Sequence, residues 1–276
     1  MVLAEPGQMS RDGEGIDAGV LDGAEESAAG PAIVCRDVVK YFGHLEALRG
    51  ATLTVRRGEV LALLGDNGAG KTTLVKCISG AYQIDGGDIR VMGEQVEAST
   101  RSTQERGVQT IYQNLALADD LSVVENVFLG REKVLPGWRG RLGIIDSRAM
   151  REETVQAAKR MGVRLRSGVE VSTRDLSGGQ RQIVAIMRAV PWASTAIMMD
   201  EPTAALGARQ RQIVYDVARQ VADGGVAVLM ISHDIPQMVE FADRVAVMRQ
   251  GRVVAERPAS ELDTSSVMSL MLGGTV

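Results

Sequence analysis

Apolar residues along this 276-residue chain follow two different spacings. Short, β-branched and partly alternating runs at 32–41 and 51–55 predict strands of a small antiparallel sheet. The next run, 59–64 (EVLALL), is almost wholly apolar, which is typical of a parallel strand buried on both faces. A helical spacing follows over 71–79, so this part of the chain predicts a strand, a glycine-rich loop and a helix.

Strands and helices alternate again in the last third of the chain. We expect strands at 196–199 and 226–231, a helix over 208–221, and another helix from about residue 235. A hairpin of 245–248 and 252–255 follows, with its turn at Gln250-Gly251. The predicted fold class is therefore α/β, with an antiparallel β subdomain beside a mainly parallel core sheet.

Residues 114–175 predict a mainly helical insertion into this α/β pattern. Ser147 is expected to be the N-cap of a helix that ends near residue 162, and Ser177 the N-cap of the next helix. Near the start of the insertion, 131–143 is rich in glycine and predicts a mobile surface loop. Trp138 in that loop could either dock on a partner or cover its own domain.

Composition limits the classes of protein that the chain could be. Hydrophobic residues make up 45% of it, yet no apolar run reaches the roughly 20 residues that cross a bilayer. Residues 1–30 are rich in Gly, Ala, Asp and Glu, so we expect a disordered tail. A formal net charge of −4 argues against nucleic acid as a main partner. Cys35 and Cys77 are expected to be small buried hydrophobes.

The loop Gly65–Thr72 (GDNGAGKT) matches the P-loop pattern, and it lies between a predicted strand and a predicted helix, as that motif requires. Backbone N–H groups of such a loop wrap phosphates, the helix N-terminus adds positive potential, and Lys71 reaches the β and γ oxygens. The residues expected to contact the nucleotide are Gly65, Asp66, Asn67, Gly68, Ala69, Gly70, Lys71, Thr72 and Thr73.

Two carboxylates follow the apolar strand at 196–199. Asp200 is expected to hold Mg²⁺, together with the hydroxyl of Thr72, and Glu201 to orient and deprotonate the attacking water. Adjacent acids at a strand end are common, but downstream of a P-loop they indicate ATP hydrolysis with Mg²⁺ as the cofactor.

The segment Leu176–Gln180 (LSGGQ), together with the P-loop, resembles the ABC transporter ATP-binding subunits. The resemblance covers about 33–273. It implies a P-loop NTPase with a RecA-like core at 31–113 and 176–276, and a helical subdomain at 114–175. It also implies that Ser177, Gly178, Gly179 and Gln180 contact ATP held by an opposite subunit, so that a homodimer or a paired cassette subunit is needed.

Three further residues acquire roles through this resemblance. Gln113 matches the glutamine that touches Mg²⁺ or the attacking water, and His233 matches the histidine that contacts the γ-phosphate. Phe42 aligns with the aromatic that stacks on adenine. Tyr41 is its close competitor, and one of the two is expected to pack inward as core.

A departure from the family pattern narrows the resemblance further. The family usually has Ser-Ala-Leu-Asp after the catalytic Glu, whereas residues 204–207 are Ala-Ala-Leu-Gly. This variant resembles the single-cassette ATPases of bacterial simple-sugar importers. The resemblance therefore implies a polytopic membrane permease as partner, an extracytoplasmic solute-binding protein as an indirect one, and a location at the cytoplasmic face of the membrane.

Other classes share the same motifs. The ATPase subunit of a drug or lipid exporter carries the same catalytic residues and stays the main alternative. A DNA-repair or chromosome-structuring ATPase would need long coiled coils, and the chain has no heptad run. A translation factor of this kind would carry two cassettes and usually a basic linker.

Overall fold

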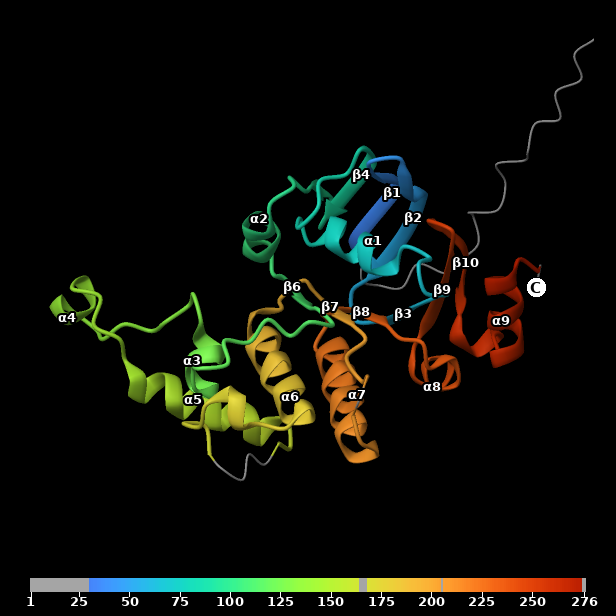
Figure 1. The fold of residues 1–276 in the computed structure, drawn as a ribbon. Coiled ribbons are helices and arrows are strands. Elements are labelled where there is room, and N and C mark those ends of the chain that lie inside the picture. Colours follow the sequence, from blue (N-terminus) through green and yellow to red (C-terminus); the bar gives the residue numbers. More distant parts are fainter. Residues whose placement is uncertain (1–29, 164–167, 205, 275–276) are drawn as a thin grey trace, which may run out of the picture.

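The computed structural model describes residues 30–163, 168–204 and 206–274. The disordered tail predicted for 1–30 lies almost entirely outside these residues. The described chain forms two sheets with helices around them (Figure 1), and the predicted α/β fold class is confirmed.

A six-stranded sheet forms the centre of the molecule. Its strands, in spatial order, are β10 (Arg252–Pro258), β9 (Arg244–Arg249), β3 (Val60–Leu64), β8 (Ala227–Ile231), β7 (Ala196–Asp200) and β6 (Val108–Ile111). All neighbours pair in parallel except β10 and β9, which form the predicted closing hairpin. Every residue of β3, β7 and β8 is buried, as expected for apolar strands covered on both faces.

The two faces of β3 belong to two different hydrophobic clusters. Leu61 and Leu63 pack with the small sheet and with α1 (Lys71–Ile78). Val60, Ala62 and Leu64 pack with the helices on the other face. Those helices are α6 (Gly178–Ala189), α7 (Ala208–Asp223), α8 (Ile235–Phe241) and α9 (Thr264–Leu272). The strand alternation therefore divides the core into two layers (Figure 1).

The small sheet is antiparallel and has four strands. In spatial order they are β2 (Leu45–Arg56), β1 (Pro31–Phe42), β4 (Gly86–Val91) and β5 (Glu94–Gln95). The runs at 32–41 and 51–55 predicted its first two strands, although β2 begins earlier than expected. Cys35 and Cys77 are both buried and free, as predicted.

The segment between β6 and α6 is largely helical. Its helices are α3 (Val123–Phe128), α4 (Trp138–Arg141), α5 (Ser147–Arg160) and the 3₁₀ turn Thr173–Asp175. Helix α2 (Thr100–Glu105) precedes β6, and short 3₁₀ turns at Val190–Trp192 and Ala259–Glu261 complete the described elements.

One prediction within this segment is wrong. Asp146, and not Ser147, caps α5, because the Asp146 carboxylate accepts a hydrogen bond from the Ala149 amide at 3.0 Å. The region 131–143 lies at the surface, as predicted, and its mobility stays a prediction. A bridge between Val134 and Ile145 closes it into a hairpin that carries α4 at its tip.

Candidate active site

A cavity of about 910 Å³ opens where β3, β7 and β8 end. This is the edge at which parallel α/β sheets bind ligands. The structure brings most of the predicted site residues to its wall: Phe42, Asn67, Gly68, Ala69, Gly70, Lys71, Thr72, Thr73, Gln113, Asp200, Glu201 and His233. Gly65 and Asp66 belong to the same loop but do not line the cavity.

The P-loop has a backbone that only glycine fits at two of its positions. Gly65 has φ +154°, and a Cβ there would collide with the carbonyl oxygen of Met248. Gly70 has φ +105°, and its Cβ would come within 2.9 Å of the carbonyl oxygen of Ala47. Because the loop passes so close to β9 and β2, a side chain at either position would displace it.

Lys71 lies inside the curve of this loop. Its ammonium group donates to the carbonyl oxygens of Gly65 at 2.6 Å and Asp66 at 2.9 Å. Burial lowers the pKa of Lys71, while the charges of Glu201 and Asp200 act in the opposite direction. The loop is thus folded around a cation that an anionic ligand could attract away from the two carbonyls.

Asp200 and Thr72 meet at the floor of the cavity. The Thr72 hydroxyl donates to Asp200 Oδ2 at 2.9 Å, and the residue Asp200 is 1% exposed. The other oxygen, Oδ1, is buried and has no hydrogen-bond partner within the described residues. Burial raises the pKa of Asp200, an effect that Thr72 and the positive charge of Lys71 oppose. A buried carboxylate oxygen without a partner is suited to a cation or to cation-bound water.

Glu201 and His233 face each other across the same end of the sheet. His233 Nδ1 and Glu201 Oε2 are 2.8 Å apart. Glu201 has φ +52°, a left-handed conformation that is unusual outside glycine, and its amide donates to the carbonyl of Ile231 at 3.0 Å. Backbone strain of this kind concentrates at functional sites. It turns the Glu201 side chain out of the β7 alternation toward His233.

Both aromatic candidates for a nucleotide base are exposed. Phe42 is 43% and Tyr41 48% exposed, so the prediction that one of them packs into the core is wrong. A register shift between Lys40 and Tyr41 interrupts the strand alternation there. Phe42 lines the cavity and packs edge-on against Tyr82, with ring centroids 5.3 Å apart. Tyr41 instead donates its hydroxyl to Glu46.

Residues 177–180 do not line the cavity of their own chain. Ser177 is the N-cap of α6, as predicted. Its hydroxyl accepts from the Gln180 amide at 3.3 Å, while the Gln180 side chain accepts from the Ser177 amide at 2.9 Å. A Cβ added at Gly178 would meet open space, whereas one at Gly179 would collide with the side chain of Gln210. Gly178 and the helix N-terminus therefore remain accessible to an outside ligand.

Gln210 also contacts the loop that departs from the family pattern. Its Oε1 accepts a hydrogen bond from the amide of Gly207, which is the N-cap of α7, at 3.4 Å. The single side chain of Gln210 thus lies against both Gly207 and Gly179.

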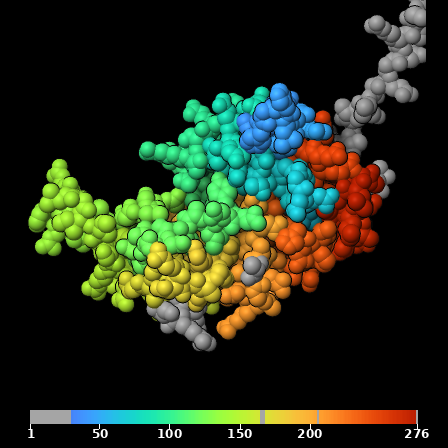
Figure 2. All heavy atoms as spheres, viewed as in Figure 1, coloured from blue at the N-terminus to red at the C-terminus, as the bar shows by residue number. Residues whose placement is uncertain are grey.

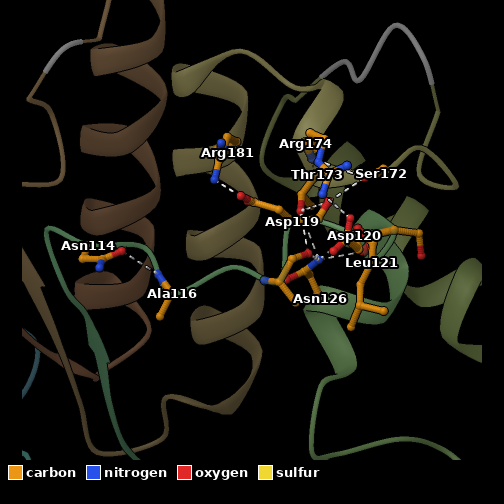
Figure 3. Close-up of polar contacts among 12 residues, drawn as sticks. Asn114, Ala116, Asp119, Asp120, Leu121, Asn126, Ser172, Thr173, Arg174 and Arg181 are labelled. Atoms are coloured by element: carbon orange, nitrogen blue, oxygen red, sulfur yellow. Dashed lines mark hydrogen bonds and ion pairs between the residues drawn. The ribbon is translucent and has the colours of Figure 1, made fainter.

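The segment that follows Gln113 is fixed to the helices around 172–188 (Figure 3). Arg188 donates to the carbonyls of Leu115 and Ala116, both at 2.8 Å, and Arg181 pairs with Asp119 at 2.5 Å. These contacts come from α6, the helix that Ser177 caps.

Asn126 lies at the centre of this network and is fully buried. It accepts from the Ala118 amide at 2.8 Å and donates to nearby carbonyls, while Thr173 bonds the same segment from the other side. Sequence reasoning missed Asn126, although a polar amide among the apolar residues of Val123–Phe128 could have drawn attention to it.

Known proteins resemble the chain over most of its length. Residues 48–204 match the family model described as "ABC transporter". A fructose import ATP-binding protein of Rhizobium meliloti is 37% identical, over 88% of this chain and 94% of that protein. A xylose/arabinose import ATP-binding protein of Sulfolobus acidocaldarius is 39% identical, over 86% and 92%. For a ribose import ATP-binding protein of Streptomyces avermitilis, 37% identical, the match covers 86% of this chain but 44% of the longer relative.

Solved structures agree with the fold. A nucleotide-free ATP-binding cassette from an ABC transporter has a TM-score of 0.74 and 24% identity, over 87% of this chain and 96% of its own. A dimeric cassette in a post-hydrolysis state with ADP and phosphate has a TM-score of 0.71 and 22% identity, over 82% and 98%. The family match and the relatives together establish that the chain belongs to the ABC transporter family and is one of its ATPases.

Proposed function

We propose that the chain is the ATP-hydrolysing subunit of a bacterial importer for a simple sugar. The observation that carries this proposal is the cavity at the end of the core sheet, which holds a P-loop lysine, a buried carboxylate and a paired Glu201 and His233. The names of the relatives, which specify import of fructose, xylose/arabinose and ribose, support an importer over an exporter.

Nucleotide binding would use the loop and the aromatic at the cavity edge. Gly68, Ala69 and Gly70 line the space where phosphates would lie, and Lys71 would exchange its two carbonyl partners for phosphate oxygens. Phe42, already braced by Tyr82, is the better candidate to stack on adenine.

The residues present fit a magnesium ion. Asp200 offers a buried oxygen that has no hydrogen-bond partner in the described part of the chain, Thr72 offers a hydroxyl beside it, and Gln113 lines the same cavity. Oxygen ligands of this kind suit Mg²⁺. When bound, the ion would neutralise charge on the phosphate oxygens. Binding of the ion by Asp200 would replace the hydrogen bond from Thr72 and leave the Thr72 hydroxyl free to act as a second ligand.

Glu201 would act as the general base. Its carboxylate is 16% exposed, and the hydrogen bond to His233 fixes its orientation. A water between Glu201 and the terminal phosphate would lose a proton to the carboxylate, while His233 would rotate to contact that phosphate.

A second copy, or a paired cassette subunit, would complete each site. Ser177, Gly178, Gly179 and Gln180 lie outside their own cavity, and the open surface over Gly178 together with the α6 N-terminus suits a phosphate presented by a partner. Closure of two copies on two ATP molecules would then move the helices that are tied to α6.

Transport would require membrane proteins in addition to this subunit. Among the described residues, no helix is both long and apolar enough to cross a membrane. A polytopic permease would carry the sugar, and a solute-binding protein outside the membrane would deliver it. The subunit would therefore lie at the cytoplasmic face of the membrane.

The variant Glu201→Gln tests the catalytic part of the proposal. Loss of the general base should reduce steady-state ATP hydrolysis by roughly 10²–10⁴-fold and leave ATP binding almost unchanged. The exposed Glu240, on α8, provides a control, because Glu240→Gln makes the same chemical change away from the cavity. A Glu201→Gln variant with the normal rate would show that the base is another residue.

Sugar uptake tests the transport part. A deletion strain should lose uptake of one simple sugar, and wild-type protein, but not the Glu201→Gln variant, should restore it. Unchanged uptake of every simple sugar tested would refute the importer, whatever the ATPase result.

A further inference from the structure

We propose that the hairpin at residues 133–146, here called the arm, adsorbs to the surface of a membrane that contains anionic lipids. The arm is the part of the described chain farthest from α9, and it projects beyond the rest of the molecule in Figures 1 and 2. Its role is separate from ATP hydrolysis, because none of its residues lines the nucleotide cavity.

The arm is an ordered platform with its own hydrogen bonds. The Leu135 amide donates to the Ile144 carbonyl at 2.9 Å, and the Asp146 amide to the Lys133 carbonyl at 2.7 Å. Lys133 also pairs with Glu153 of α5, which fixes the base of the arm to the helical segment. Helix α4 at the tip is therefore presented at a defined place.

Large apolar side chains are concentrated on the arm. Leu142 is 69% exposed and Trp138 67%, and three more side chains are at least two-fifths exposed: Val134, Ile144 and Ile145. Exposed apolar groups scattered singly over a surface need no explanation, but five within twelve residues indicate a surface that is covered in use.

The charge of the arm tip is opposite to that of the whole protein. Residues 134–145 include Arg139 and Arg141 and no acidic residue, whereas the chain has a net charge of −4. Within the described part of the chain, no carboxylate forms an ion pair with either arginine. The Arg139 guanidinium lies 5.6 Å from the centre of the Trp138 ring, so charge and aromatic surface are adjacent.

This combination fits the interface of a lipid bilayer. Trp and long aliphatic side chains insert at the level of the headgroups, and basic side chains beside them attract anionic phosphates. A second copy of the arm is a poorer occupant, because symmetric contact would bring Arg139 and Arg141 of both copies together. Adsorption would add a contact between the proposed importer subunit and the membrane that involves no permease.

Trp138 provides a direct measurement, because the chain has two tryptophans. In a Trp192→Phe background, Trp138 is the only reporter in the full-length protein. Addition of phosphatidylglycerol vesicles should shift its fluorescence to shorter wavelength, and phosphatidylcholine vesicles should not. An increase in salt from about 0.1 M to about 1 M, which shortens the Debye length from about 10 Å to about 3 Å, should reverse the shift.

Vesicle co-sedimentation then tests the residues. The double variant Arg139→Gln, Arg141→Gln should bind phosphatidylglycerol vesicles about 25-fold more weakly, or about fivefold for each arginine. The double variant Arg36→Gln, Arg257→Gln removes the same charge from exposed positions outside the arm and should bind normally.

A second pair of variants tests the apolar contribution. Leu142→Ser should weaken vesicle binding, while Leu272→Ser, at a residue that is 82% exposed on α9, should not. Equal thermal stability and ATPase rates would show that the arm variants are folded.

Several results would overturn the proposal. One is equal binding to neutral and anionic vesicles, and another is equal loss in the arm and control variants. A shift of Trp138 fluorescence that depends on protein concentration without vesicles would assign the arm to contact between copies. Binding only to membranes that contain the permease would assign it to that protein. Because the assay needs neither ATP nor sugar, its failure would leave the proposed importer function untouched.

Discussion

Replacement of Asn126 should destabilise the protein more than any exposed polar substitution near it. The side chain is 0% exposed, and its Oδ1 accepts from the Ala118 amide at 2.8 Å. Its Nδ2 lies within hydrogen-bond distance of the carbonyls of Ala118, Leu121 and Ser122, at 3.0, 3.2 and 3.0 Å. The side chain therefore holds a whole turn of backbone between Gln113 and α3.

The cost of Asn126→Ala follows from which groups lose their last partner. The Ala118 carbonyl keeps the Thr173 hydroxyl at 2.9 Å, and the Leu121 carbonyl keeps the Thr173 amide at 3.0 Å. The Ala118 amide keeps no partner among the described residues. One orphaned donor at about 1–3 kcal/mol, plus about 1 kcal/mol for the net hydrogen bonds removed, predicts a loss of about 2–4 kcal/mol in the free energy of unfolding.

The variant Asn126→Asp separates hydrogen bonding from side-chain volume. It keeps the shape, but it places a carboxylate oxygen where Nδ2 now faces three carbonyl oxygens. The buried charge raises the folded-state pKa of the new carboxyl, so stability is lost as pH rises through that pKa and is regained in acid. Asn126→Asp should therefore be less stable than Asn126→Ala at pH 7, and the difference should shrink as pH falls.

Urea unfolding, followed by circular dichroism and by tryptophan fluorescence, measures both effects. The control is Asn114→Ala, because Asn114 is exposed and makes one local hydrogen bond, to the Ala116 amide at 3.4 Å. We expect this control to change the free energy of unfolding by less than about 0.5 kcal/mol. An Asn126→Ala variant as stable as that control would refute the assignment of the network.

Three further predictions concern the cavity wall and the core. Asp200→Asn should raise the melting temperature of the nucleotide-free protein at pH 7. Burial raises the pKa of Asp200, so the wild-type protein loses stability as pH rises and the carboxyl becomes charged. The gain from Asp200→Asn should vanish as pH falls toward 3.8, and no gain at pH 7 would contradict the prediction. Gly65→Ala should abolish ATP binding and lower the free energy of unfolding by at least about 3 kcal/mol. Gly68→Ala, at a residue with φ +81° and open space around it, should lower the free energy of unfolding by about 1–2 kcal/mol. Equal melting curves for the two variants would disprove this prediction. Burial raises the pKa of the Cys77 thiol to about 11, so Ellman's reagent at pH 8 should label this cysteine only after the protein unfolds. Fast labelling of Cys77 in the native protein would contradict this prediction.

The sequence predicted the core strands β3, β7 and β8 well, because they are buried on both faces, whereas β6 was not predicted. A strand such as β3 or β8 must be apolar at every position, and this leaves a continuous run in the sequence. The P-loop was equally predictable, since Gly65 and Gly70 are required by the close approach of neighbouring backbone. The gathering of Asp200, Glu201 and His233 also follows from parallel strands that end at one edge.

Elements held by tertiary contacts were harder to predict. Strands β4 and β5 contain glycine and charged residues and have no apolar run, since they depend on pairing with β1. Asp146 and Ser147 are both good N-cap residues, and only the backbone decides between them. Asn126 could not be assigned a role because most of its partners are backbone groups, which leave no signal in the sequence.

The side chain of Gln210 contacts two segments of the chain that have different proposed roles. Its Oε1 accepts from the amide of Gly207, which lies in the stretch after Glu201, the proposed base for the chain's own ATP. The same side chain covers Gly179, which lies in the segment proposed to contact a partner's ATP. A displacement of Gly207 or of Gly179 would therefore move the Gln210 side chain against the other glycine. In a pair of such subunits, each copy would report the state of its own nucleotide through the same surface with which it serves the other.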